Sequence, residues 1–240
     1  MNFVLDTHTH TIASGHAYSS IQEMIQAGKE KGLSLLGISE HGPAMPGSCQ
    51  EIYFLNLKVI PNTYKEIEVL FGAEANIIDY SGKLDLSNET LSHLNYGIAS
   101  LHTPCLAPGS KKENTKAYLC AMENPYINVI GHPDDGKYPY DTEELVKQAK
   151  QTNTLLEVNN SSLSPNSFRM NAHDNVKKFL SYCAELDVPI IVNSDAHISY
   201  DVGNFSYAKT LLEEIDFPSN LIVNCDLHLY KKMLADKMRP

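Results

Sequence analysis

Residues 2–11 read Asn2-Phe3-Val4-Leu5-Asp6-Thr7-His8-Thr9-His10-Thr11. Three apolar residues are followed at once by an acid and then by two histidines separated by one residue. This order predicts a short buried strand whose carboxyl end carries the histidines. A signal peptide would instead begin with basic residues and continue with a longer apolar segment. Taken alone, a His-x-His pair fits an exposed or hydrogen-bonded strand end as well as it fits a metal site.

The rest of the chain repeats this arrangement. Short runs rich in Val, Ile and Leu alternate with longer amphipathic stretches, as expected for βα units with a parallel sheet. Seven such runs predict strands over residues 2–6, 34–39, 67–74, 96–101, 128–131, 154–159 and 189–194. Helices are predicted over residues 20–31, 113–123, 142–151, 174–186, 207–215 and 227–238. Residues 48–64 resist assignment, and residues 79–87 are expected to form a small polar hairpin.

Composition limits the class of protein. A chain of 240 residues with 42% hydrophobic and 20% charged residues predicts a single globular domain over residues 1–240. The net charge of -10 argues against binding to long nucleic acid, but bound metal ions could still attract a small anionic substrate. No apolar run approaches the roughly 20 residues of a membrane span. Five scattered cysteines without a CxxC pair predict reduced thiols in a cytoplasmic protein, and the sequence indicates no oligomeric state.

Histidines and acids fall at the ends of the predicted strands. Five of the strands are followed directly by histidines, which are His8, His10, His41, His102, His132 and His197. The third strand ends in Glu74, and Asp195 follows the seventh. In a parallel barrel the carboxyl ends of the strands meet at one mouth, so these side chains are expected to be neighbours. Imidazole and carboxylate ligands suit zinc, iron or manganese, and the pattern therefore predicts a metal site.

Four motifs carry a family resemblance. They are Asp6-Thr7-His8-Thr9-His10-Thr11 with His16, Ser39-Glu40-His41-Gly42, Ser100-Leu101-His102 and Ser194-Asp195-Ala196-His197. Together with Glu74 and Gly131-His132-Pro133, they make most of the chain similar to the PHP (polymerase and histidinol phosphatase) domain family. Within this family the chain looks closest to the short stand-alone phosphatases similar to YcdX. The resemblance implies an α/β fold, a distorted (β/α)7 TIM-like barrel, that carries three divalent metal ions, usually zinc.

The resemblance also implies a ligand set. The family pattern places the first metal on His8, His10, Glu74 and Asp195, the second on Glu74, His102 and His132, and the third on His16, His41 and His197. His16 does not follow a predicted strand, so its assignment as a metal ligand depends on the resemblance more than that of the other residues does. The expected reaction is hydrolysis of a small phosphate monoester by a hydroxide that bridges the first two metals, with Glu74 and Asp195 as the catalytic carboxylates. Manganese or iron are alternatives to zinc.

Substrate choice is expected to depend on loops at the barrel mouth, over residues 108–114, 134–140 and 159–170. Arg169 is the candidate substrate-binding residue, because its guanidinium offers a fork of donors to a second anionic group such as phosphate or carboxylate. A surface ion pair between Arg169 and some acid is an equally open interpretation.

Two other functions remain open at this point. Amidohydrolase-type barrels also have His-x-His after the first strand and an aspartate on a late strand. They bridge their metals through a modified lysine or another carboxylate, and their scheme has no place for His16, His41 and His197. A catalytically quiet PHP module that binds metal for stability or docking is the second alternative.

Overall fold

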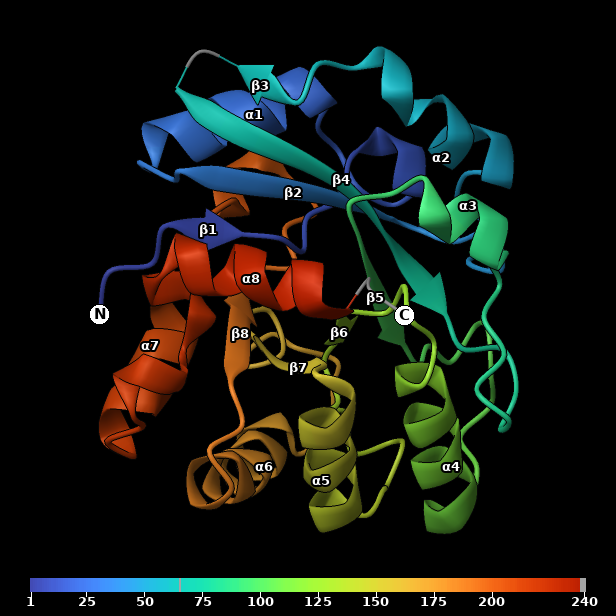
Figure 1. Cartoon of the computed structure of the whole chain (residues 1–240), viewed down its shortest axis with the longest axis vertical. Coiled ribbons are helices and arrows are strands. Elements are labelled where there is room, and N and C mark those ends of the chain that lie inside the picture. Colours follow the sequence, from blue (N-terminus) through green and yellow to red (C-terminus); the bar gives the residue numbers. More distant parts are fainter. Residues whose placement is uncertain (65, 238–240) are drawn as a thin grey trace.

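The computed structural model describes residues 1–64 and 66–237. Seven parallel strands in the order β1-β2-β4-β5-β6-β7-β8 form a nearly closed barrel (Figure 1). Their bounds are β1 Leu5–Asp6, β2 Leu35–His41, β4 Ile67–Asn76, β5 Tyr96–Ser100, β6 Val129–Ile130, β7 Leu155–Asn159 and β8 Ile190–Asn193. The predicted barrel of seven parallel strands is therefore confirmed.

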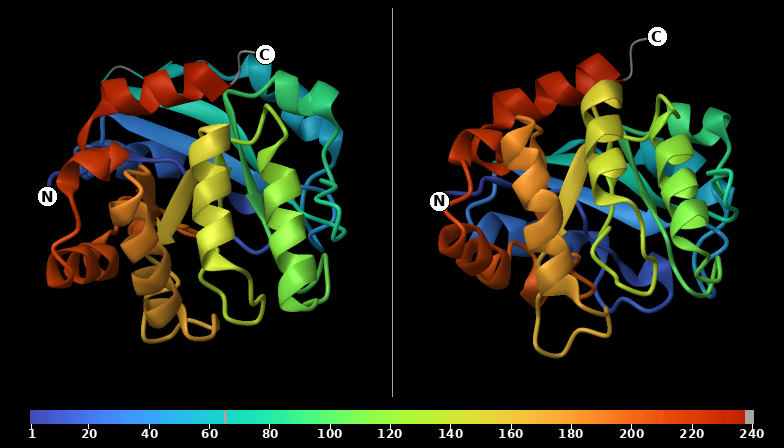
Figure 2. Two further views of the ribbon diagram at one scale, coloured as in Figure 1. Left: turned by 60° about the horizontal axis from the view of Figure 1, so that its bottom comes forward. Right: turned by 90° about the horizontal axis from the view of Figure 1, so that it is seen from below.

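Helices alternate with the strands and cover the barrel. They are α1 Ile21–Glu30, α2 Glu51–Asn56, α3 Asn88–Ser92, α4 Lys111–Met122, α5 Thr142–Thr152, α6 Ala172–Glu185, α7 Ser206–Glu214 and α8 Leu227–Lys237. In the turned views α4, α5 and α6 stand side by side along one flank (Figure 2). The predicted helices correspond to α1 and α4 to α8, and the predicted end of the last one, Met238, lies outside the described residues. None of the described helices is long and apolar enough to cross a membrane.

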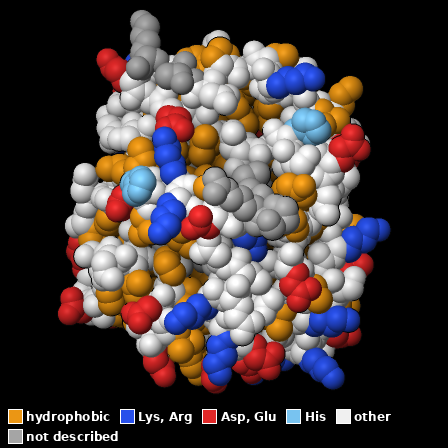
Figure 3. Space-filling model, viewed as in Figure 1, with side chains coloured by type: hydrophobic (Ala, Val, Ile, Leu, Met, Phe, Trp, Pro, Cys, Tyr) orange, Lys and Arg blue, Asp and Glu red, His pale blue; other side chains and the backbone are white. Residues whose placement is uncertain are grey.

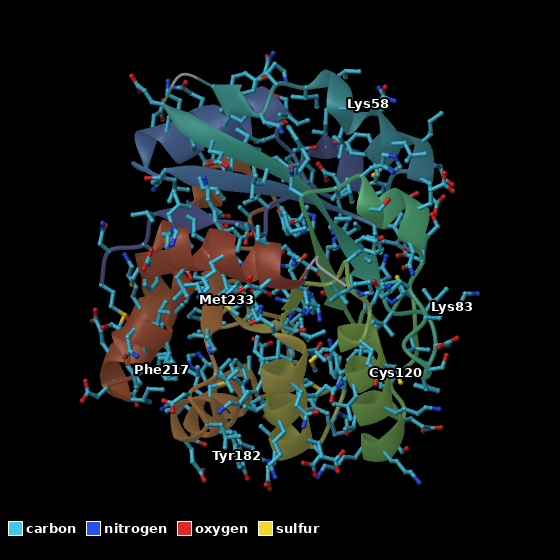
Figure 4. The ribbon with its side chains drawn as sticks, viewed as in Figure 1. Lys58, Lys83, Cys120, Tyr182, Phe217 and Met233 are labelled. Atoms are coloured by element: carbon cyan, nitrogen blue, oxygen red, sulfur yellow. The ribbon has the colours of Figure 1, made fainter. Side chains whose placement is uncertain are left out.

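The structure defines two segments that the sequence left uncertain or described only roughly. Residues 48–64 contain α2, a 3-10 turn at Leu57–Val59 and the short strand β3 Thr63–Tyr64, which pairs antiparallel with β4. The hairpin expected over residues 79–87 is reduced to one antiparallel bridge, between Ile77 and Leu84, and a turn in which the Asp79 carboxylate accepts hydrogen bonds from the backbone N–H groups of Ser81 and Lys83. Lys83 points away from the molecule at this turn (Figure 4).

An apolar layer fills one end of the barrel. Each of the seven strands contributes a buried aliphatic side chain to it, namely Leu5, Leu35, Leu70, Ile98, Val129, Leu155 and Ile191, and β5 adds Tyr96. Helix α8 packs onto this layer through Tyr230, Met233 and Leu234, and Met233 is labelled in Figure 4. Because side chains alternate along a strand, the interior positions two residues further on lie nearer the carboxyl ends. Four of these positions hold buried polar side chains, which are Thr7, Ser100, Glu157 and Asn193, and the other three are glycines.

Buried polar side chains, Asn224 among them, close the seam between β1 and β8. Nδ2 of Asn224 donates to the carbonyl oxygens of Leu5 at 3.0 Å and Val192 at 2.6 Å, and its Oδ1 accepts from the backbone N–H of Val192 at 2.7 Å. The backbone carbonyl of Asn224 also accepts from the N–H of Val4. Asn224 thus bridges the first and last strands, together with Asn193, whose Oδ1 accepts from the N–H of Thr7 at 2.8 Å, and Asp6, whose Oδ1 accepts from the N–H of Ser194 at 3.1 Å.

The surface carries charges of both signs. On the face seen in Figure 3, acidic and basic side chains are interspersed, and neither sign gathers into a stripe. A stripe of Lys and Arg is the usual mark of a nucleic-acid interface, and this face offers none.

Candidate metal centre

Glu74, near the end of β4, lies at the centre of the predicted ligands. Oε1 lies 2.8 Å from Nε2 of His132 and 3.2 Å from Nε2 of His102. Oε2 lies close to three more imidazole nitrogens, at 2.7 Å from Nδ1 of His41, 3.2 Å from Nε2 of His8 and 3.4 Å from Nε2 of His10. One buried carboxylate therefore contacts five histidines that come from four other strand ends.

Asp195 brings the remaining predicted residues into the same cluster. Oδ1 lies 3.4 Å from Nε2 of His10 and 3.6 Å from both Nε2 of His8 and Nδ1 of His197. On the outer side, Nε2 of His197 is 3.1 Å from Nε2 of His16, which is exposed. The structure thus brings all nine predicted residues together.

The cluster fits bound cations. Nε2 of His8, Nε2 of His10, Nδ1 of His41 and Oε2 of Glu74 are buried and have no hydrogen-bond partner among the described residues. Buried polar atoms without partners are uncommon, and a missing ion is one of the accepted reasons. Four overlapping groups have ligand atoms within 4.8 Å of one another: His8, His10 and Glu74; His8, His132 and Asp195; His41, Glu74 and His102; and His10, His41 and His197. These groups cut across the three ligand sets of the sequence analysis, because His41 lies next to Glu74 as well as to His197.

At Glu74 and His10, electrostatics favour the protonation states in which these two residues bind metals. Burial alone would raise the pKa of Glu74, but His8, His41 and His102 hold it well below its usual value. Burial, together with His41 and His197, lowers the pKa of His10 well below its usual value. The carboxylate is therefore ionised and His10 is neutral, which are the forms in which these residues bind metals.

The backbone is left-handed at two of the cluster residues. φ is 27° at His132 and 56° at Asp195, values that residues other than glycine rarely adopt. Such conformations cost about 1–3 kcal/mol each and are concentrated at functional sites. At both positions the turn directs the side chain into the cluster instead of continuing the strand.

Buried acceptors that the sequence analysis did not single out hold several of the histidines. Glu157, on β7, is fully buried, with Oε1 2.7 Å from Nδ1 of His8, and Oε2 accepts from the N–H of His132 at 2.7 Å. Oδ1 of Asn76 is 2.7 Å from Nδ1 of His102. A charged residue within the apolar strand Leu155-Leu156-Glu157-Val158 is the signal that could have identified Glu157, because buried acids need partners.

Glu40 supports His10 through a serine. Oγ of Ser14 lies 3.2 Å from Nδ1 of His10 and donates to the Glu40 carboxylate, which also accepts from the N–H of Thr11. The ring orientations of His8, His10 and His102 are thus each set by a hydrogen bond at the nitrogen that faces away from the cluster, as is usual for metal-binding histidines.

A pocket of about 590 Å³ opens over the cluster. Arg169 lines it with its side chain only 7% exposed, and donates from Nη2 to Oδ2 of Asp195 at 3.1 Å. Its Nη1 donates to Ser162 at 2.9 Å and Asn159 at 3.2 Å. Residues of the loops over 134–140 and 159–170 line the pocket, whereas none of residues 108–114 does; residues 101–104 lie there instead.

Comparisons with known proteins agree with this geometry. The PHP domain family matches residues 6–214. A protein of Clostridium novyi described as "Probable phosphatase" is 44% identical over 235 residues, which cover 98% of this chain and 94% of that protein. One of Acetivibrio thermocellus with the same description is 41% identical over 237 residues, covering 99% and 97%. The histidinol phosphate phosphatase of Lactococcus lactis, crystallised with zinc, L-histidinol and phosphate, has a TM-score of 0.58 at 16% identity, covering 89% of this chain and 94% of that one. At this identity the last likeness supports the fold alone.

Proposed function

The chain belongs to the PHP domain family, and from this we propose that it is a metal-dependent phosphatase that hydrolyses a small phosphate monoester. The observation that carries the proposal is the Glu74 carboxylate, surrounded by five imidazoles at the floor of an open pocket. Relatives that match nearly the whole chain are described as phosphatases. All five cysteines are free, which supports a cytoplasmic location.

The proposed metal centre holds three divalent ions, in the ligand sets that the family resemblance implies. Imidazole and carboxylate donors suit zinc, the metal in the Lactococcus lactis structure, and they also accept manganese and iron. When bound, such ions would supply Lewis acidity, positive charge for a phosphate dianion and a lowered pKa for water.

The chain's own residues supply binding and orientation. Glu74 and Asp195 are the proposed catalytic carboxylates, because each touches several of the histidines at once. Glu157 and Asn76 fix the rings of His8 and His102. Arg169 uses three of its five N–H groups on Asn159, Ser162 and Asp195, and we assign the remaining two to a substrate oxygen.

The first test combines metal analysis with turnover. Gently purified protein is analysed for metal content, and phosphate release from a panel of monoesters is measured before chelation, after chelation and after metal is restored. About three metals per chain, with activity that is lost and regained, would support the proposal. One or two metals would contradict the trinuclear centre. Full occupancy without phosphate release from any ester would favour an amidohydrolase or a quiet module.

A matched pair of variants separates chemistry from folding. Asp195→Asn is expected to lower turnover by more than about 100-fold, because the amide removes a charge from the cluster. Asp187→Asn is the control, since Asp187 is exposed and has a similar left-handed backbone, with φ 52° against 56°. Both variants should keep the thermal midpoint of the barrel within a few degrees. Equal activity in the two would contradict a catalytic role for Asp195.

A further inference from the structure

We infer that the substrate's alcohol carries no anionic group and has an apolar part, which the ring of Phe168 contacts at the pocket mouth. This inference rests on the proposed phosphatase activity. It describes the alcohol that is released when the ester is hydrolysed, whereas the metal cluster would bind the phosphate.

Phe168 is an exposed aromatic side chain that lines the pocket. Its exposure is 75%, which is high for a phenylalanine, yet the side chain is held in place. Nζ of Lys137 lies 5.0 Å from the ring centroid and Cζ of Arg169 lies 5.4 Å from it. Cations at such distances are attracted to an aromatic ring, so the ring has a preferred position. Nζ of Lys137 also donates to the carbonyl oxygen of Phe168 at 3.1 Å.

The loops on both sides of Phe168 are tied to each other. The N–H of Gly136 donates to the carbonyl of Met170 at 2.7 Å, and the N–H of Met170 donates to Oδ1 of Asp135 at 3.2 Å. A Cβ at Gly136 would lie 2.7 Å from that carbonyl oxygen, so only glycine permits this approach. The contacts join the loop after β6 to the loop after β7. A ring presented on a fixed loop loses little entropy when a ligand packs against it.

The rest of the pocket wall continues the apolar surface. Met45, Pro46, Leu101 and Pro104 line it together with Phe168. The cluster supplies the polar floor, where a phosphate would bind, and these side chains supply a wall that has few hydrogen-bonding groups. A small-molecule site commonly combines an apolar wall with a few placed polar groups in this way.

The charges at the pocket disfavour an anionic alcohol. Among the described residues that line it, Arg169 is the one Lys or Arg, and it is paired with Asp195 at 3.1 Å. Lys137 lies next to the pocket, but its Nζ is 3.8 Å from Oδ2 of Asp135. Asp135 and Asp201 are both lining residues. A carboxylate or second phosphate on the alcohol would therefore meet Asp135 and Asp201, while Arg169, already paired with Asp195, is left to bind an oxygen of the phosphate that is cleaved.

The test uses esters that differ only beyond the scissile bond. Ethyl phosphate, 2-phenylethyl phosphate and 3-carboxypropyl phosphate are all esters of primary alcohols, so their leaving groups are similar. The metal-replete wild type is expected to show the highest kcat/KM for the phenylethyl ester and the lowest for the carboxypropyl ester. Phe168→Ala is expected to lose about tenfold in kcat/KM on the phenylethyl ester, mainly through KM, and less than about twofold on the ethyl ester.

Two further variants control the experiment. Phe168→Tyr keeps the ring and should retain the preference for the phenylethyl ester. Ile52→Ala removes an apolar side chain of nearly equal exposure, 76%, that does not line this pocket, and should behave as the wild type.

The outcomes separate the inference from the function on which it rests. If none of the three esters released phosphate, the proposed phosphatase activity would fail. If all were hydrolysed with equal kcat/KM, or if Phe168→Ala kept the wild-type preference, the activity would stand and the inference about the alcohol would be wrong.

Discussion

Oε1 of Glu157 and Nδ1 of His8 are 2.7 Å apart, and both side chains are fully buried. The same carboxylate accepts from Nδ2 of Asn193 at 2.9 Å, from the N–H of His132 at 2.7 Å and from Nδ2 of Asn159 at 3.0 Å. Burial alone would raise the pKa of Glu157, but His8 and His132 lower it, so the carboxylate stays ionised. In the neutral ring, which is the form that binds metal, a charged acceptor at Nδ1 places the lone pair of His8 on Nε2, which faces Glu74 and Asp195.

Glu157→Gln is expected to weaken metal binding by about 10- to 100-fold, because a neutral amide holds the His8 ring less firmly and does not favour one tautomer. The measurement is competition with a chelator of known affinity, read by metal content instead of turnover. Glu213→Gln, at an exposed position on α7, is the matched control. Wild-type metal affinity in Glu157→Gln would show that the contact does not position His8.

Arg169→Lys is expected to lower kcat/KM by about 10- to 100-fold, since an ammonium cannot bridge Asp195, Ser162 and Asn159 as the guanidinium does. Arg169→Ala provides a sharper test, because added guanidine should restore part of its activity. If the lysine variant had the wild-type kcat/KM, charge alone would account for the role of Arg169.

Asn224→Ala is expected to lower the free energy of unfolding by about 2–4 kcal/mol, because buried backbone groups of Leu5 and Val192 would lose their partners. Urea denaturation measures the change. Asn220→Ala, at an exposed position nearby, should change stability by less than about 0.5 kcal/mol. Equal midpoints for the two variants would mean that the seam closes without the side-chain amide.

The burial of Lys237 predicts that the free energy of unfolding depends on pH. Its Nζ donates to the last carbonyls of α4 and α5, at Met122 and Thr152, and burial lowers its pKa from 10.5 to about 8. Between these pH values the unfolded chain holds more protons than the folded one, so the contribution of this group to stability rises with pH. Lys237→Met should flatten the stability profile between about pH 8 and 10.5 relative to the wild type.

Lys232→Met, an exposed position on the same helix, is the control for loss of a lysine charge. Profiles with equal slopes for the wild type and Lys237→Met would contradict the lowered pKa. Chemical denaturation at several pH values provides the data.

Much of the fold could be predicted because apolar runs mark buried parallel strands directly. The prediction over residues 34–39 and β2 Leu35–His41 overlap closely, and the histidines follow the strands as their order in the sequence indicated. The short strand β3 could not be predicted in this way. It has two residues at a sheet edge, too few to show periodicity, and its pairing with β4 depends on tertiary contacts.

The site was predictable in its residue types but not in its connections. Strand-end histidines and acids are visible in the sequence, whereas the partners of Arg169 and Glu157 depend on the distance in space between separate strands. Asn224 follows the apolar run Leu221-Ile222-Val223, yet it gave no signal of its own, because its partners Leu5 and Val192 become its neighbours only in the folded chain.

The apolar layer that α8 covers has a consequence for how such chains change during evolution. Its seven side chains are buried at the amino-terminal ends of the strands, away from the pocket. Loops at the opposite end can therefore be lengthened, exchanged or recombined while this apolar layer keeps its packing. Changes in the loops around the pocket alone could therefore alter substrate preference. This makes the barrel a suitable recipient for grafted loops in the laboratory.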